Sequence, residues 1–182
     1  MNFGLTDEQE MVVNTVRTFV ENEIYPLEKE VEKTGLVPDE IGQEIKNKVL
    51  KLGFFAPNMP EDVGGGGLDN LSFALLEREL GRGSQGLTIF WGRPSNILMA
   101  CNQEQKEEYL FPAIKGEKFD ALAMTEPGAG SDVRGMKCFA KKDGEDFIIN
   151  GTKHFISHAN IADFVIVFIA TGEEETPKGK KK

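Results

Sequence analysis

The chain has few cysteines and histidines and lacks any long apolar run. Among 182 residues there are two cysteines, Cys101 and Cys138, and they lie in no CxxC spacing. Neither a disulfide framework nor a cysteine zinc site is therefore indicated. The only histidines, His154 and His158, fall in a segment that reads as strand and loop, so we predict no metal site. Because no apolar run approaches the roughly 20 residues that cross a bilayer, we also predict no membrane span.

Basic residues are also scarce. The chain has 21 lysines and arginines and 30 acidic residues, which gives a net charge of −9. This charge opposes attraction to phosphate backbones, so we predict no nucleic-acid partner. The N-terminal sequence MNFGLTDEQE carries acids where a signal peptide needs basic and then apolar residues. We expect a cytoplasmic location, with the mitochondrial matrix as the alternative if a transit peptide preceded this sequence.

The apolar spacing divides the chain into two parts. It is helical up to about residue 116 and strand-like after Phe119, which predicts an all-α domain over residues 1–118 and a β domain over 119–182. In the first helix, Pro26 predicts a kink or break and Gly35 the end. The helices are expected at residues 6–35, 38–52, 69–81 and 103–115, and the third has Leu71, Ala74, Leu75 and Leu80 as its apolar face.

Four strands are expected in the second part. They cover residues 119–124, 136–141, 146–157 and 163–170, and Asp143-Gly144 predicts a hairpin turn between the middle two. We interpret them as one open sheet that ends at a lysine-rich tail, residues 178–182. Its exposed edge and apolar face predict that the 182-residue chain alone aggregates or needs a partner.

Residues 123–132, with the sequence AMTEPGAGSD, follow the first strand directly. The two glycines and small hydroxyl side chains can bring backbone N–H groups close to a phosphate or to the edge of a heteroaromatic ring. Thr125 and Ser131 can donate or accept hydrogen bonds beside that main chain. A plain turn is the alternative interpretation of the same composition.

A second segment, residues 151–160, lies at the end of the third expected strand. Alternation along a strand puts Phe155 and Ser157 on one face and His154 and Ile156 on the other. An aromatic ring two residues from a hydroxyl could form the wall of a site for a planar ligand. The alternative is that Phe155 belongs to an ordinary sheet core. Neither segment offers a nucleophile, a charged dyad or a catalytic base.

Seven short motifs together resemble the acyl-CoA dehydrogenase family, FAD-dependent enzymes that introduce an α,β double bond into an acyl-CoA thioester. The motifs occur in the order and spacing of the family and cover nearly the whole chain. The TEPGAGSD string is the most specific of them. They are LTDEQ at 5–9, PEDVGG at 60–65, EQK at 104–106, YLFP at 109–112, TEPGAGSD at 125–132, NGTK at 150–153 and FIS at 155–157.

The resemblance implies an α+β fold, in which an N-terminal helical domain is followed by an incomplete β-barrel-like middle domain. Family members are about twice as long and end in a C-terminal helical bundle that supplies the catalytic glutamate. That bundle is absent from this sequence, so we assign no catalytic residue within residues 1–182 and expect this chain alone to be inactive.

The resemblance also implies which residues contact FAD. Thr125 would lie near the isoalloxazine ring, and Ser131 would reach both the pyrophosphate and the acyl-CoA substrate. Where the family usually has tryptophan and threonine, this chain has Phe155 and Ser157, which keep an aromatic surface and a hydroxyl. The implied cofactor-binding residues are Leu122, Ala123, Met124, Thr125, Gly130, Ser131, Phe155, Ile156 and Ser157.

Further implications concern partners and alternatives. The family passes electrons to an electron-transfer flavoprotein, and the complete protein is expected to be a homo-oligomer, either a tetramer or a dimer. An acyl-CoA oxidase-like flavoenzyme and a non-catalytic binding or interaction module derived from the family are the alternatives. Residues 92–95 fall where the family lines its acyl pocket, which suggests an unusual acyl group. A structural Arg93 paired with an acid is the other interpretation.

Overall fold

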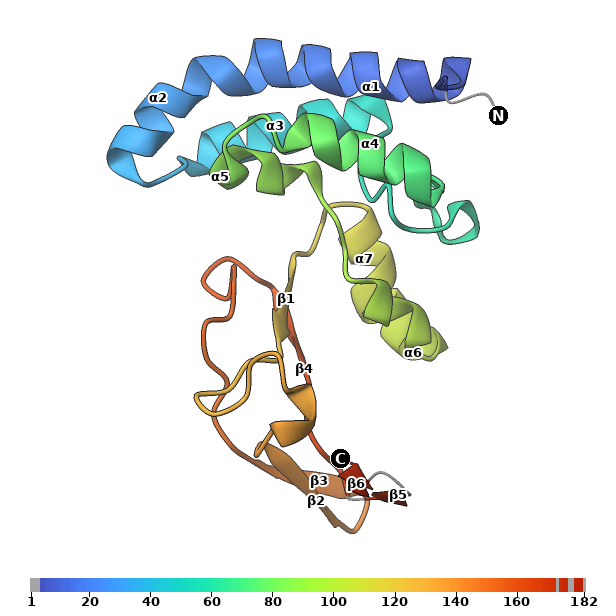
Figure 1. The fold of residues 1–182 in the computed structure, drawn as a ribbon, viewed down its shortest axis with the longest axis vertical. Coiled ribbons are helices and arrows are strands. Elements are labelled where there is room, and N and C mark those ends of the chain that lie inside the picture. The colour runs from blue at the N-terminus through green and yellow to red at the C-terminus, as the bar shows by residue number, and fades with distance from the viewer. Residues whose placement is uncertain (1–3, 173, 177–178, 182) are drawn as a thin grey trace. The chain divides into compact units, whose positions relative to one another are not determined.

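The computed structural model describes residues 4–172, 174–176 and 179–181. Lys178 and Lys182 of the expected lysine-rich tail lie outside the described residues. The chain forms two compact units, Met1–Glu117 and Lys118–Lys182, which are described separately. The first is helical and the second contains the strands (Figure 1). Within the described ranges, no helix has the length and apolar character that crossing a bilayer requires.

The first unit begins with a long helical rod. It consists of α1 (Asp7–Phe19), the π-helical turn η1 (Val20–Ile24) and α2 (Tyr25–Thr34), and Figure 1 shows the three as one continuous stretch. Thr6 caps α1 because its hydroxyl accepts a hydrogen bond from the Gln9 N–H at 3.2 Å. The rod ends at Gly35, whose φ of 69° is left-handed, as predicted.

Two prolines account for the two π-helical turns. One turn ends two residues before Pro26 and the other, η5 (Lys106–Leu110), ends two residues before Pro112. Proline has no N–H, and its ring clashes with the carbonyl four residues earlier, so a regular α-helical register cannot continue through it. A turn bonded five residues back absorbs this mismatch. The interruption predicted at Pro26 is therefore a local change of helix type.

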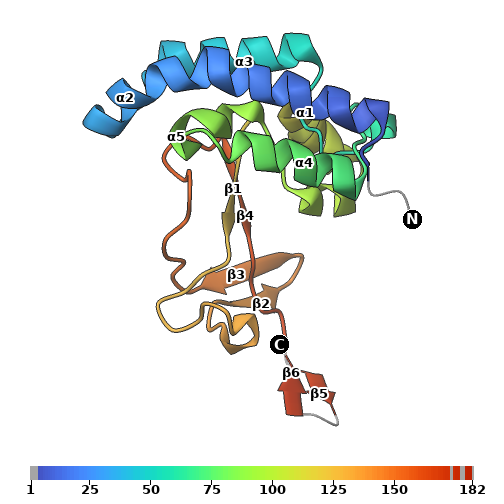
Figure 2. The same ribbon diagram turned by 45° about the horizontal axis from the view of Figure 1, so that its top comes forward.

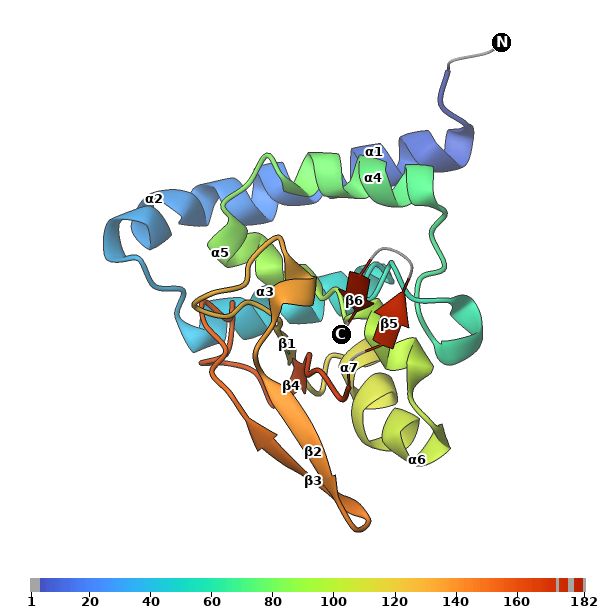
Figure 3. The ribbon, with the colours of Figure 1, turned by 60° about the horizontal axis from the view of Figure 1, so that its bottom comes forward.

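The other helices of this unit are shorter than the rod. Figures 1 and 3 both show α4 alongside α1. The helix expected at residues 38–52 is α3, and it begins one residue later because Pro38 is its cap residue. The helical elements are α3 (Asp39–Leu52), η2 (Glu61–Val63), α4 (Asn70–Leu80), α5 (Gln85–Thr88), η3 (Ile89–Trp91), η4 (Asn96–Ala100), α6 (Gln103–Gln105), η5 and α7 (Phe111–Ile114).

The core of the helical unit is centred on Trp91, which is fully buried and meets the Phe19 ring edge-on at 4.9 Å between centroids. The expected face of α4 is partly wrong, because Leu71 is 53% exposed and Ala74 is also exposed. The buried face includes Leu76 and Glu79 instead, and the two hydrogen bonds that Arg17 of α1 donates to the Glu79 carboxylate favour this rotation. A buried glutamate was not part of the expected apolar face.

The glycine-rich loop at residues 57–67, which follows α3, packs against its own backbone. A Cβ atom on Gly65 would collide with the main chain of Met59. The N–H of Gly67 donates to the Met59 carbonyl at 2.8 Å, and that of Gly66 donates to the Ala56 carbonyl at 3.0 Å. Internal packing therefore explains these glycines, and they form a turn rather than a ligand site.

The described residues of the second unit form three separate two-stranded sheets, so the expected single open sheet is wrong. β1 (Asp120–Ala123) pairs in parallel with β4 (Phe164–Val167). β2 (Phe139–Asp143) and β3 (Asp146–Asn150) form the predicted hairpin, which is clear in Figure 2. β5 (Glu174–Thr176) pairs with β6 (Gly179–Lys181). The described residues form no closed barrel, and a parallel bridge between Phe139 and Ala170 links the hairpin to the segment after β4.

Candidate functional site

The candidate site begins where β1 ends. Burial alternates along this strand, with Ala121 and Ala123 buried and Leu122 38% exposed. The chain then turns tightly, since the N–H of Glu126 donates to the Ala129 carbonyl at 2.9 Å and the reverse bond is 3.2 Å. This turn lies within the loop at residues 125–132, which follows β1 at the end of the sheet.

The two glycines of this loop leave open space. A Cβ atom on Gly128 or Gly130 would meet no atom within 4 Å, and neither residue has a left-handed φ. Neither packing within the chain nor backbone conformation therefore requires glycine here. The open space leaves room for a bound group, such as a phosphate or a flat ring, to approach the main chain closely.

Glu126 belongs to this loop, and its side chain is 4% exposed. It accepts hydrogen bonds from the backbone N–H of Lys137 at 2.6 Å, from that of Cys138 at 2.9 Å and from Lys153 Nζ at 2.9 Å. These donors favour the ionised form, and they hold the pKa of Glu126 at about 2, with the Lys137 N–H as the largest cause. Glu126 is therefore a fixed structural anion at neutral pH.

Hydrogen bonds bring the two segments singled out from the sequence together. Lys153 Nζ donates to the Met124 carbonyl at 3.0 Å, and the N–H of His154 donates to the Thr125 carbonyl at 2.8 Å. Thr125, which lies two residues after the end of β1, and Phe155 are thus held near each other. Thr125, Ser131 and Ser157 make no side-chain hydrogen bond to any described residue, and Gly130, Ser131 and Ser157 are exposed.

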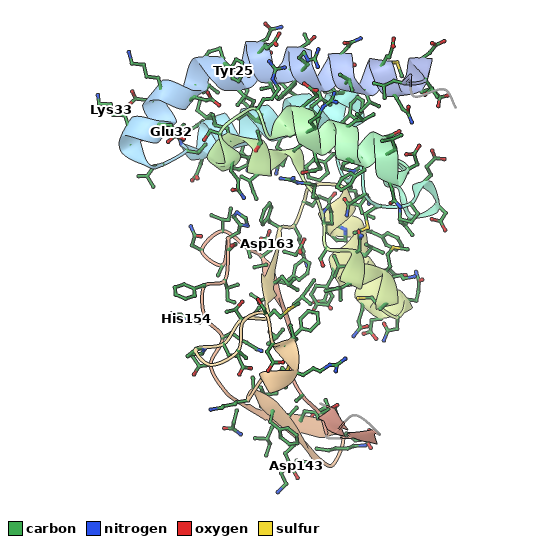
Figure 4. All side chains as sticks on the ribbon, in the orientation of Figure 1. Tyr25, Glu32, Lys33, Asp143, His154 and Asp163 are labelled. Carbon is green, nitrogen blue, oxygen red and sulfur yellow. The ribbon has the colours of Figure 1, made fainter. Side chains whose placement is uncertain are left out.

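The expected strand through residues 146–157 is wrong in its second half. β3 ends at Asn150, because Gly151 has a φ of 149° and the chain then turns toward the Met124 and Thr125 carbonyls. The alternation assigned to residues 154–157 therefore does not apply. Figure 4 labels His154 and Asp163 on the connection between β3 and β4.

Phe155 is not part of a sheet core. Its side chain is 81% exposed, its φ is 55°, and its ring stacks on that of His154 at 3.7 Å between centroids. Ile156, by contrast, is half-buried. The left-handed backbone conformation of this exposed aromatic residue costs free energy, and such strain is common at ligand sites.

Sequence reasoning missed Glu126 and Lys153, although both lie inside the motifs that it quoted. The available signal was the acidic Glu126 in the first motif, which also contains Asp132, and the single basic residue, Lys153, in the second. The structure also bears on the two interpretations of residues 92–95. Arg93 forms an ion pair with Glu77, and both side chains are about one-third exposed or less, so the structure supports the interpretation of Arg93 as a structural residue.

Comparison with known proteins identifies the family. Residues 6–117 match the family model described as "Acyl-CoA dehydrogenase, N-terminal domain", and residues 121–182 match "Acyl-CoA dehydrogenase, middle domain". The 3-(aryl)acrylate reductase of Clostridium sporogenes is 39% identical, over 96% of this chain and 46% of that protein. Caffeyl-CoA reductase-Etf complex subunit CarC of Acetobacterium woodii is 34% identical, with the same two coverages.

A solved structure supports the same assignment. A glutaryl-CoA dehydrogenase from Mycobacterium smegmatis, in complex with FADH2, superposes with a TM-score of 0.78 at 30% identity. The match covers 92% of this chain and 43% of that one. The chain thus spans about half the length of the relatives that it matches. Two consecutive family domains account for nearly all of its residues, and the chain belongs to the acyl-CoA dehydrogenase family.

Proposed function

We propose that this chain supplies one side of the FAD site in an enzyme that dehydrogenates an acyl-CoA thioester between its α and β carbons. The observation that carries the proposal is the open space over Gly128 and Gly130, and the exposed aromatic ring of Phe155 supports it. Bound FAD would supply the two-electron acceptor that this oxidation requires. The base that takes the α-proton is not assigned within these residues.

The chain's own residues would bind and orient the two ligands. The exposed residues Gly128, Gly130 and Ser131 offer main-chain N–H donors to phosphate oxygens, and Ser131 adds a hydroxyl that can reach FAD or acyl-CoA. Thr125, held through its carbonyl by His154, offers a hydroxyl to the edge of the ring system. Phe155 offers a flat apolar surface. Leu122 to Met124 and Ile156 to Ser157 complete the proposed contacts.

The electron acceptor in this proposal is an electron-transfer flavoprotein. The name of the Acetobacterium woodii relative places that protein in a complex with Etf, and this supports a similar partner here. We further propose a cytoplasmic homo-oligomer. The apolar residues exposed on β2 and β3 support an assembly that covers them.

Reduction of a carbon–carbon double bond is the second candidate function. Two relatives, at 39% and 34% identity, are named as reductases of aryl-substituted acrylic compounds or of caffeyl-CoA. The same site can serve either direction, because the two reactions share one flavin and one pair of carbons. Assays with a saturated acyl-CoA and with an aryl-acrylyl-CoA, each under its own electron acceptor or donor, distinguish them.

The experiment that tests the flavin site is a titration with FAD, followed by flavin fluorescence, on the purified protein that carries this chain. Gly130→Val fills the open space above the loop, whereas Gly172→Val is a matched control at another glycine whose Cβ would meet no atom within 4 Å. We expect the first variant to bind FAD at least tenfold more weakly and the second to match the wild type. Equal affinities would remove the loop from the site.

A further inference from the structure

We propose that Lys153 and Glu126 form a positioning pair that holds residues 122–131 and 153–157 together, so that FAD meets a preformed surface. The inference rests on the proposed function, because it concerns the same surface. Neither residue is expected to touch the reacting atoms. Their contribution is to fix the position of Thr125 and Phe155.

Lys153 is anchored at two points on the loop side. Its Nζ lies 2.9 Å from Glu126 Oε1 and 3.0 Å from the Met124 carbonyl oxygen. The side chains of Lys153 and Glu126 are 10% and 4% exposed, so water competes little for either charge. Breaking one partner of such a buried pair leaves the other charge uncompensated, which makes the two residues depend on each other.

Glu126 is itself held in place by the chain on its other side. Its two oxygens accept from the N–H groups of Lys137 and Cys138, which precede β2. One carboxylate therefore ties together the loop after β1, the approach to β2 and the segment after β3. These contacts separate residues by 11, 12 and 27 positions along the chain. A carboxylate with several such partners can fix the relative positions of segments that no local turn connects.

The pair acts on Phe155 through the intervening residue. His154 is next to Lys153, and its N–H bonds to the Thr125 carbonyl at 2.8 Å. Phe155 follows with a φ of 55°, a side chain 81% exposed, and a ring contact with His154. A residue keeps a left-handed backbone conformation only where surrounding contacts hold it there. The hydrogen bonds of Lys153 and His154 are the nearest contacts that can hold Phe155.

The test uses two single variants, Lys153→Met and Glu126→Gln, and the double variant. Lys142→Met and Glu145→Gln, at the exposed tip of the β2–β3 hairpin, remove the same charges as matched controls. Two quantities are measured on the purified protein: the dissociation constant for FAD, and the rate of hydrogen exchange at the His154 amide without FAD.

We expect each single variant to weaken FAD binding about tenfold or more and to accelerate exchange at the His154 amide. The double variant should be no worse than either single variant, since both remove the same contact. The hairpin controls should change neither quantity. Unchanged exchange at His154 would overturn the positioning role.

Two further outcomes separate this inference from the proposed function. If the variants only lower the melting temperature while FAD affinity stays equal to that of the controls, the pair is structural and the inference is wrong. If the wild type binds no FAD while exchange at His154 still accelerates in the variants, the proposed function fails. In that case the pair positions the two segments, and the flavin part of the inference is overturned with it.

Discussion

Arg17 in α1 places its Nε 3.0 Å from Oε2 of Glu79 in α4, and this joins two helices across 62 positions of sequence. Arg78 and Arg82 donate to the same carboxylate, which is 2% exposed. Figure 3 shows the two helices running alongside each other. One buried anion thus compensates three half-exposed cations and fixes the packing of α4 beneath α1.

Replacing Glu79 should destabilise the helical unit. Glu79→Gln leaves three guanidinium groups without their shared anion, and we expect the free energy of unfolding to fall by about 2 kcal/mol, since the arginines can still reach water. Urea denaturation followed by circular dichroism measures the change. Glu30→Gln, at an exposed position in α2, serves as the control and should stay within about 0.5 kcal/mol of the wild type. A loss no larger than that of this control would contradict the role given to Glu79.

Two carboxylates should make the fold sensitive to acid. The pKa of Glu79 is lowered from 4.5 to about 2, chiefly by Arg17, and that of Glu126 is lowered to about 2, chiefly by the Lys137 N–H. A group whose folded pKa lies below its unfolded pKa contributes stability above the unfolded value and loses it as pH falls through the folded value. Stability should therefore decline between about pH 4.5 and pH 2.

The measurement is the free energy of unfolding as a function of pH for the wild type, Glu79→Gln and Glu126→Gln. Each variant should show a shallower decline below pH 4.5, because one titrating group has been removed. Identical pH profiles for the three proteins would show that neither carboxylate is held in its ionised form by folding.

The face that α4 buries can be tested with two leucines of one helix. Leu76 is fully buried and Leu71 is 53% exposed. Leu76→Ala should cost about 3 kcal/mol through lost burial and a residual cavity, whereas Leu71→Ala should cost less than about 0.5 kcal/mol. The reverse order would favour the rotation expected from the apolar spacing alone. Chemical denaturation gives both values.

Gly151 should not tolerate a side chain, because Cys138 occupies the space that a Cβ atom would need, whereas the space over Gly130 is open. A Cβ atom on Gly151 would lie 2.7 Å from the Cα of Cys138, and its φ of 149° is poorly accessible to other residues. Gly151→Ala should therefore lower the melting temperature clearly, by contrast with Gly172→Ala, which meets open space. Differential scanning fluorimetry compares the two, and equal melting temperatures would show that this close approach is absent in solution.

The apolar side chains exposed on the hairpin should promote self-association. Phe147, Ile148 and Ile149 are each at least 50% exposed on β3. We expect the 182-residue chain alone to scatter light above the level of a monomer, and Ile148→Lys to reduce that scattering, because a charge on an exposed strand opposes edge pairing. A monodisperse wild-type monomer would contradict this expectation.

The sequence was informative where the controlling interactions are local. Thr6, Gly35 and the Asp143-Gly144 turn act within a few residues, so their effects on helix ends and on the hairpin could be predicted from neighbours alone. The loop at residues 125–132 was found because its composition is unusual at one place in the chain. Each of these signals depends on short-range geometry.

Long-range relationships could not be predicted in the same way. The parallel pairing of β1 with β4 joins residues 44 positions apart, such as Asp120 and Phe164, and alternation gives no indication of it. The apolar pattern continued past Asn150, although the hydrogen bonds of Lys153 and His154 draw the chain out of the strand there. The structural roles of Glu126 and Glu79 depend on hydrogen-bond donors that are distant in the sequence, so the sequence alone did not indicate them.

The most direct test of the proposed flavin surface is to map FAD binding by amide chemical shifts on the isotope-labelled protein. The account predicts that the largest shifts fall at residues 122–131 and 153–157, with Gly128, Gly130 and Phe155 among them. Shifts confined to other residues, or no shifts at saturating FAD, would contradict it.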